Sequence, residues 1–294
     1  MELDSAFSYC AGEVRRLDRD RFLCALFAPA DARRGLMALY AFNLELARIP
    51  ETVSEPLLGH MRLQWWRDAL TAHYGGKPVP NHQTAVALAR TITRHGLDHA
   101  AFKRMLDGRA FDLDDRPFAD LAAFEAYAEA TSATLAGLAL DVLGQDGRGV
   151  RQAAKHVGMA WALSGHLRAA QHHALAGRLY LPWALMEGAG IGADALVAKT
   201  ASPAPAQIAR IAQVARPIAE RAWDHLQRAR EAGRDAPRAA LPALLPATLA
   251  AADLRRLARL GYDLTSPKLE ANRAARQLRL YWHALSWYAP RGRF

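Results

Sequence analysis

Cysteine and long apolar runs are both scarce in this chain. The 294 residues include only two cysteines and no Cys-x-x-Cys, which excludes a disulfide scaffold and indicates a reducing compartment. No stretch approaches the roughly 18 consecutive apolar residues of a membrane-spanning helix, and the first residues carry too many charges for a signal peptide. We therefore expect a cytoplasmic protein that is soluble or peripheral to a membrane.

The composition excludes disorder for most of the chain. Hydrophobic residues make up 51% and charged residues 23%, so enough apolar surface can be buried to offset the entropy lost on ordering. The formal net charge is +9. No nucleic-acid-binding motif accompanies this excess, so no nucleic acid is expected as a partner.

The sequence pattern predicts an all-α fold. Glycine and proline occur in clusters, and the stretches between them are rich in Ala, Leu, Arg and Glu, which favour helix. Apolar residues recur at helical spacing from Ala32 to Leu46, and Pro50 then breaks or kinks the element. Only Arg178 to Leu181 could be extended, because Pro182 disfavours helix at the residue before it. Further helices are predicted over 54–74, 82–95, 98–107, 120–143, 149–175, 206–232, 239–250, 252–260 and 268–288.

A stretch rich in glycine, alanine and proline, residues 186–205, is predicted to be a flexible surface connection. The helices on either side of it are equally rich in alanine and equally amphipathic, so it need not divide two domains. We expect one domain over 1–294, with about ten helices in a bundle.

Basic charge is concentrated in the segment 253–294, which has nine basic and three acidic residues, a net of +6. Arg273, Arg276 and Arg279 share a helix face, and an apolar side is formed by Leu278, Trp282, Leu285 and Trp287. Such a helix suits an anionic membrane surface. The alternative is a helix docked on the core with a solvated basic face.

Three segments, 38–70, 105–115 and 156–182, together resemble the squalene/phytoene synthase family, and the resemblance extends over nearly the whole chain. It implies an isoprenoid-synthase-type helical bundle with a central cavity, in which two prenyl diphosphates are joined head to head. The matching framework consists of Ala41-Phe42, Trp65-Trp66-Arg67, Asp107-Gly108, Asp112-Leu113, Leu167-Arg168 and Gly177-Arg178-Leu179-Tyr180-Leu181-Pro182.

The metal-binding aspartates of that family are largely missing. In the family, Mg²⁺ held between carboxylates neutralises the diphosphate leaving group. The first aspartate motif falls here on Ala47, Arg48 and Glu51, and the second falls on Ala169 and His173. One carboxylate therefore remains, and we expect no metal site, no cofactor and no synthase reaction.

An active prenyltransferase with a degenerate, Mg²⁺-dependent site is the alternative function. Glu51 and Asp112 are then the residual catalytic candidates, and Arg168 and Arg178 would handle the diphosphate. A zinc site is not expected, because His166 and His173 share a helix face seven residues apart, a wider spacing than zinc sites use.

Three runs resemble one subgroup of the family more closely than they resemble active synthases. The runs are residues 20–33, 43–66 and 260–287, and the subgroup contains the mitochondrial complex I assembly factor with a phytoene-synthase-like domain, whose members also lack the aspartates. This resemblance implies a pseudoenzyme that acts by binding, with respiratory complex I subunits or assembly intermediates as partners, peripheral to the inner membrane.

A remaining pocket could bind an anionic head group without metal, through Arg48, Arg168, Arg178 and Tyr180. An isoprenoid or lipid tail would then occupy a tunnel whose lining is predicted to consist of Phe42, Leu46, Leu135, Leu138 and Met159. In the alternative interpretation the cavity has collapsed into ordinary core, and the arginines pair with Glu51 and Asp112.

Overall fold

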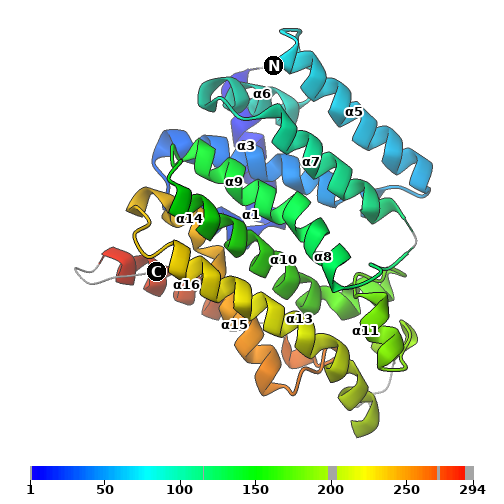
Figure 1. Ribbon diagram of the computed structural model, residues 1–294. Coiled ribbons are helices and arrows are strands. Elements are labelled where there is room, and N and C mark those ends of the chain that lie inside the picture. The colour runs from blue at the N-terminus through cyan, green and yellow to red at the C-terminus, as the bar shows by residue number, and fades with distance from the viewer. Residues whose placement is uncertain (1, 115, 198–203, 270–271, 289–294) are drawn as a thin grey trace.

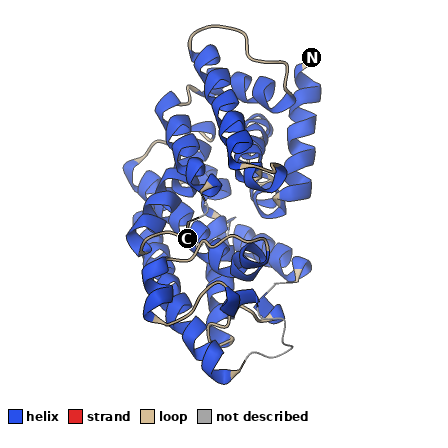
Figure 2. Ribbon diagram, turned by 90° about the vertical axis from the view of Figure 1, so that its right-hand side faces the viewer, coloured by secondary structure: helices blue, strands red, loops and turns tan. Residues whose placement is uncertain are grey.

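The computed structural model describes residues 2–114, 116–197, 204–269 and 272–288, and within these ranges every regular element is helical (Figures 1 and 2). The predicted all-α fold is confirmed. The longer elements are α1 (Leu3–Leu17), α3 (Ala30–Ala47), α5 (Pro56–Tyr74), α6 (Gln83–His95), α7 (His99–Ala110), α10 (Arg148–Leu175), α13 (Pro205–Ala232), α15 (Pro246–Arg259) and α16 (Arg273–Tyr288). The shorter ones are α2 (Arg19–Ala25), α4 (Ile49–Thr52), η1 (Phe111–Leu113), α8 (Leu121–Ala128), η2 (Glu129–Ala133), α9 (Thr134–Val142), α11 (Trp183–Gly188), α12 (Asp194–Val197), η3 (Arg238–Ala240), α14 (Leu241–Leu244) and η4 (Pro267–Leu269).

Local chemistry accounts for several helix ends. The carboxylate of Asp98 accepts a hydrogen bond from the Ala100 backbone N–H at 3.0 Å, and that of Asp120 accepts one from Ala123 at 2.8 Å, as expected of N-caps. Helix α6 ends at Gly96, whose φ of +61° is a left-handed conformation that costs glycine little. These signals lie close to the predicted helix ends.

One of the predicted helix boundaries is wrong. The sequence pattern separates 239–250 from 252–260, whereas α15 runs through that boundary without interruption. The break lies earlier, between α14 and Pro246, because proline is favoured in the first turn of a helix and disfavoured in its interior. Two helices before residue 30, α1 and α2, were not predicted.

The core is continuous, which agrees with a single domain. One cluster of buried apolar side chains reaches from Ala6 in α1 to Ala284 in α16. Helix α10 crosses the middle of the molecule (Figure 1) and packs against α13, α15, α9 and η2. The buried side chains of α10 therefore face several different neighbours.

The predicted connection 186–205 is helical in part. Residues 186–188 complete α11 and 194–197 form α12, where Met186 and Leu196 are buried in the core. Residues 198–203 lie outside the described residues. Within the part of the chain that is described, no helix combines the length and the apolar character needed to cross a membrane.

Helix α10 approaches η2 so closely that only glycine fits between them. A Cβ added at Gly158 would lie 2.5 Å from the Ala133 Cα and 2.7 Å from the Ser132 carbonyl oxygen. These are backbone atoms, so the clash can be relieved only by moving an element. The segment predicted as one helix, 120–143, makes a π-turn at η2 where it meets α10.

We expect Gly158→Ala to lower the free energy of unfolding by about 1–3 kcal/mol, because the added methyl group overpacks this contact. The measurement is urea denaturation. Gly165→Ala is the matched control on the same helix, since no atom lies within 4 Å of the position that its Cβ would take, and it should be neutral or stabilising by up to about 1 kcal/mol. Equal effects of the two substitutions would show that the close approach is unimportant.

Candidate functional site

Helix α10 contains most of the second motif segment, and the candidate side chains of that segment lie on two faces of the helix. Arg168 faces α15 and α2, whereas His166 and His173 share another face and contact the ring of Tyr180. Helical periodicity accounts for this division, because positions seven apart lie on one face. The two faces have different electrostatic character and are described in turn.

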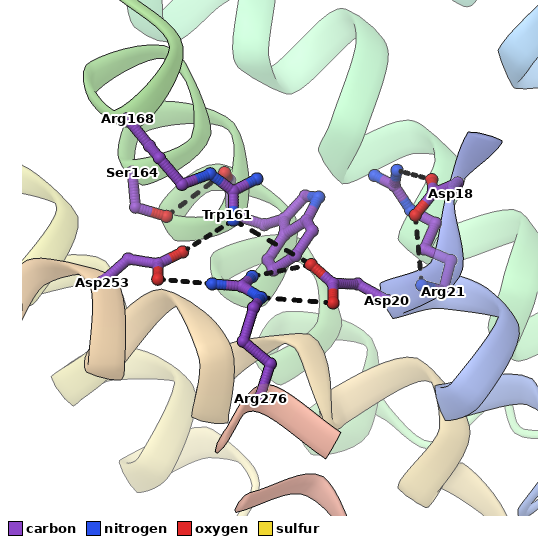
Figure 3. A network of polar contacts seen from close by, with 8 residues as sticks. All are labelled: Asp18, Asp20, Arg21, Trp161, Ser164, Arg168, Asp253 and Arg276. Atoms are coloured by element: carbon purple, nitrogen blue, oxygen red, sulfur yellow. Dashed lines mark hydrogen bonds and ion pairs between the residues drawn. The ribbon is translucent and has the colours of Figure 1, made fainter. Parts of the chain in front are cut away.

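Arg168 belongs to a network of ion pairs among four helices (Figure 3). Its guanidinium lies 3.1 Å from Asp253 on α15 and 3.9 Å from Asp20 on α2. Arg276 on α16 contacts the same two carboxylates, at 2.5 Å to Asp253 and 2.6 Å to Asp20. We call these four residues the four-helix ion network. Because two arginines balance two carboxylates, Arg168 is not free to bind an anion without losing an ion pair.

The network is largely withdrawn from water. The side chains of Asp253 and Arg276 are 5% and 10% exposed. Hydrogen bonding and the charges of Asp20 and Asp253 outweigh the effect of burial and raise the pKa of Arg276. The Trp161 ring, within 6.0 Å of Arg168, covers the network from α10.

The opposite face of α10 contributes to a histidine–tyrosine cluster, which consists of His166, His173, Tyr127 and Tyr180. The rings of His166 and His173 lie 5.2 Å and 4.8 Å from that of Tyr180, and His166 lies 5.7 Å from Tyr127. Burial lowers the pKa of His166 to about 4 and that of His173 to about 3. Both imidazoles are therefore neutral near pH 7, and Nδ1 of His173 is buried without a hydrogen-bond partner.

Asp112 lies beside this cluster and is almost fully buried. Its Oδ2 accepts hydrogen bonds from Arg109 at 3.0 Å and from the Tyr127 hydroxyl at 3.1 Å, while Oδ1 is buried without a partner. Arg109 comes from the end of α7 and also donates to Tyr127 at 2.8 Å. Asp112 is thus neutralised by an arginine three residues before it, and not by Arg168 or Arg178.

The first motif segment lies where α3 ends. Ala47 is the last residue of α3, Arg48 caps it, and Glu51 belongs to α4. Arg48 Nε lies 3.9 Å from the Glu51 carboxylate, and both side chains are substantially exposed. Arg178 donates a hydrogen bond to the carbonyl oxygen of Pro50 and so connects this segment to the end of α10.

These residues do not fit the magnesium cluster that the resemblance implies. Mg²⁺ prefers oxygen ligands, but the two motif segments offer one exposed carboxylate, Glu51, with Arg48 beside it, and the neutral imidazole of His173. Asp112 is paired with Arg109. Among the described residues, no group of three or more His, Cys, Asp or Glu side chains is arranged to hold a metal ion.

The five residues predicted to line a tunnel are all buried. Phe42 packs edge to face against Trp66 and Phe102, with ring centroids 5.0 Å and 5.5 Å apart. Leu135 borders a small cavity of about 20 Å³. Leu138 lines an open groove of about 870 Å³ between α7, α9 and α10, far larger but bordered by charged side chains. Leu46 and Met159 are also buried.

Sequence reasoning missed the partners that neutralise its candidate residues. Asp20 and Asp253 were not assigned to Arg168, and Arg109 was not assigned to Asp112. The spacing of three residues between Arg109 and Asp112 could have indicated that pair. No spacing rule links Asp20 to Arg276, which lie 256 residues apart.

Comparison with known proteins decides the family. Residues 14–284 match the family model described as squalene/phytoene synthase. The chain belongs to the squalene/phytoene synthase family. Its fold is that of the family as well: a ligand-bound dehydrosqualene synthase structure matches with a TM-score of 0.82 and 20% identity over 98% of both chains.

Two kinds of relative within the family are similar in sequence. A Bos taurus protein named NADH dehydrogenase (ubiquinone) complex I, assembly factor 6, is 32% identical over 274 residues, covering 93% of this chain and 80% of the relative. A presqualene diphosphate synthase of Rhodopseudomonas palustris is 29% identical over 203 residues, covering 68% and 69% respectively. The resemblance to both the family and its assembly-factor subgroup is confirmed.

We expect Arg276→Met to lower the free energy of unfolding by about 3 kcal/mol, because it leaves Asp20 and Asp253 to share Arg168 alone. Arg276→Lys should recover part of the loss, since an ammonium group cannot form the same forked contacts. Urea denaturation measures both. Arg279→Met on the exposed side of the same helix is the control, and a loss of equal size there would contradict the assignment.

Stability should also fall with acidification below about pH 6.5. His173 has a folded-state pKa of about 3 against 6.5 for the unfolded chain, so below that pH the unfolded state binds the proton first and is favoured. His173→Phe removes this contribution, which reaches at most roughly 2 kcal/mol at about pH 5. Urea denaturation at about pH 7.5 and pH 5 measures it. The neighbouring His172→Phe, at an exposed position, is the control and should still lose stability between the two pH values.

Proposed function

We propose that this chain is a non-catalytic member of the squalene/phytoene synthase family that supports the assembly of respiratory complex I by binding its subunits or assembly intermediates. Mammalian relatives named complex I assembly factor 6 match it over 93–95% of its length at 30–32% identity. Homologues of that factor in Dictyostelium discoideum and Drosophila melanogaster match over 65% and 59%. Those named presqualene diphosphate synthase match over 56–68% of its length. The extent of the likeness favours the first group.

The main support for a non-catalytic role is the environment of the second motif segment. Arg168 is engaged by Asp20 and Asp253, and His173 replaces a carboxylate with an uncharged ring. A synthase must collect positive charge from metal ions around a leaving diphosphate. Here Arg168 and Arg276 already pair with Asp20 and Asp253. The interior therefore supports a structural role better than the ionisation of a prenyl diphosphate.

An isoprenoid or lipid ligand remains part of the hypothesis. The buried side chains of Phe42, Leu46 and Leu135 could border a tail only if the packed core opens. Native mass spectrometry of the purified chain, followed by extraction of any bound lipid, tests this part separately.

Deletion of the gene is expected to reduce NADH:quinone reductase activity and the amount of assembled complex I on native gels, with squalene and carotenoid products unchanged. Complementation with Glu51→Gln should restore assembly as fully as the wild-type gene does, because no catalytic carboxylate is needed. Loss of isoprenoid products with intact complex I would overturn the proposal.

A direct assay complements the genetic one. The purified chain, incubated with farnesyl diphosphate and Mg²⁺, should release no diphosphate above the rate measured without protein. Diphosphate release that Glu51→Gln or Asp112→Asn abolishes would instead establish the alternative, an active prenyltransferase.

A further inference from the structure

Helix α16 docks on the core through one side and leaves its apolar side uncovered. Leu280 and Ala284 are buried against the core, and Arg276 is held in the four-helix ion network. Arg276 was predicted to share a helix face with Arg273 and Arg279; Asp20 and Asp253 draw it inward, whereas Arg279 is exposed. The side chain of Arg273 lies outside the described residues.

The outward side of α16 presents four large apolar side chains. Leu278 is 69% exposed, Tyr281 44%, Trp282 76% and Leu285 66%. Leu278, Trp282 and Leu285 are spaced by four and three residues, so they form one stripe along the helix. Exposing such a contiguous stripe to water is unfavourable, which indicates that another apolar phase covers it.

Arginines border the stripe on both sides. On one side, Arg279, Arg255 and Arg230 surround His283 and, after burial, lower its pKa further. All three are exposed, and they come from α16, α15 and α13. On the other side, Arg19 of α2 donates to the Gln277 side chain. Positive charge on four helices thus surrounds an apolar centre.

We propose that this face of α16 is a docking surface for the anionic headgroups and outer acyl region of a lipid bilayer, with the helix lying parallel to the membrane plane. The arginines would contact lipid phosphates, and Leu278, Trp282 and Leu285 would enter the region just below them. Tyr281 and Trp282 have the mixed character that suits the boundary between water and acyl chains. The proposal does not depend on the role in complex I assembly.

The geometry favours a bilayer over a protein groove. The stripe runs along a single helix, and the four charged residues identified beside it are all arginines, as an anionic lipid surface requires. A membrane-spanning segment is not needed for this contact. Two further basic residues of the predicted C-terminal segment, Arg291 and Arg293, lie outside the described residues.

The test is co-sedimentation of the full chain with vesicles of phosphatidylcholine alone and of equal parts phosphatidylcholine and phosphatidylglycerol. We expect binding to the anionic vesicles, weaker binding to the neutral ones, and a decline as salt is raised. The double substitution Trp282→Ala and Leu285→Ala should weaken binding about tenfold or more. Arg279→Gln should weaken it about fivefold, the roughly 1 kcal/mol that one basic residue adds near such a surface.

A matched control is available on α5, where Leu57 and Met61 are 65% and 61% exposed. Leu57→Gln with Met61→Gln removes a similar apolar area elsewhere and should leave vesicle binding unchanged. Circular dichroism and thermal unfolding confirm that each variant is folded.

Three results would overturn the proposal. The first is no binding of the wild-type chain to anionic vesicles, and the second is an equal loss of binding in the α5 control. The third is a dimer in light scattering that the Trp282→Ala and Leu285→Ala chain loses while vesicle binding is unaffected, which would assign the face to a second copy of the chain.

Discussion

The structure depends on the mutual neutralisation of two carboxylates, the buried Asp253 and the partly buried Asp20, by two arginines. A buried carboxylate is costly unless a cation and hydrogen bonds compensate for the water it has lost. Arg276 supplies that compensation from α16, and Arg168 supplies it from α10. The same contacts fix which side of α16 faces the core, and therefore which side chains remain exposed. One set of ion pairs thus determines both the partners of Arg168 and which side chains α16 exposes to water.

The interior combines the family fold with different side chains at the positions where the resemblance places the aspartate motifs. The framework residues around the second motif remain, and Arg178 still connects that segment to Pro50 near the first. The position of one aspartate is taken by His173, whose ring packs against Tyr180. Ring contacts and one internal ion pair, Arg109 with Asp112, now occupy the region.

The sequence predicted most of the helices, because apolar periodicity and helix-ending residues act locally. It did not predict the first two, and it misplaced one boundary near Pro246. Family positions pointed to Asp112 and Arg168 as important, but not to their partners, because pairs such as Asp20 and Arg276 follow from tertiary packing alone. The burial of Arg276 was also not predicted. A helix with both a basic and an apolar face does not itself specify which face packs against the core.

The pairing of Asp20 with Arg276 has a consequence for biosynthesis. The two residues are 256 positions apart, so during translation Arg276 becomes available to Asp20 only after α3 to α15 have left the ribosome. Contacts between such distant residues carry a large loop-closure cost and form late. The docking of α16 is therefore the step that completes the fold, and a nascent chain lacking it would display the surfaces of α2 and α15 to chaperones.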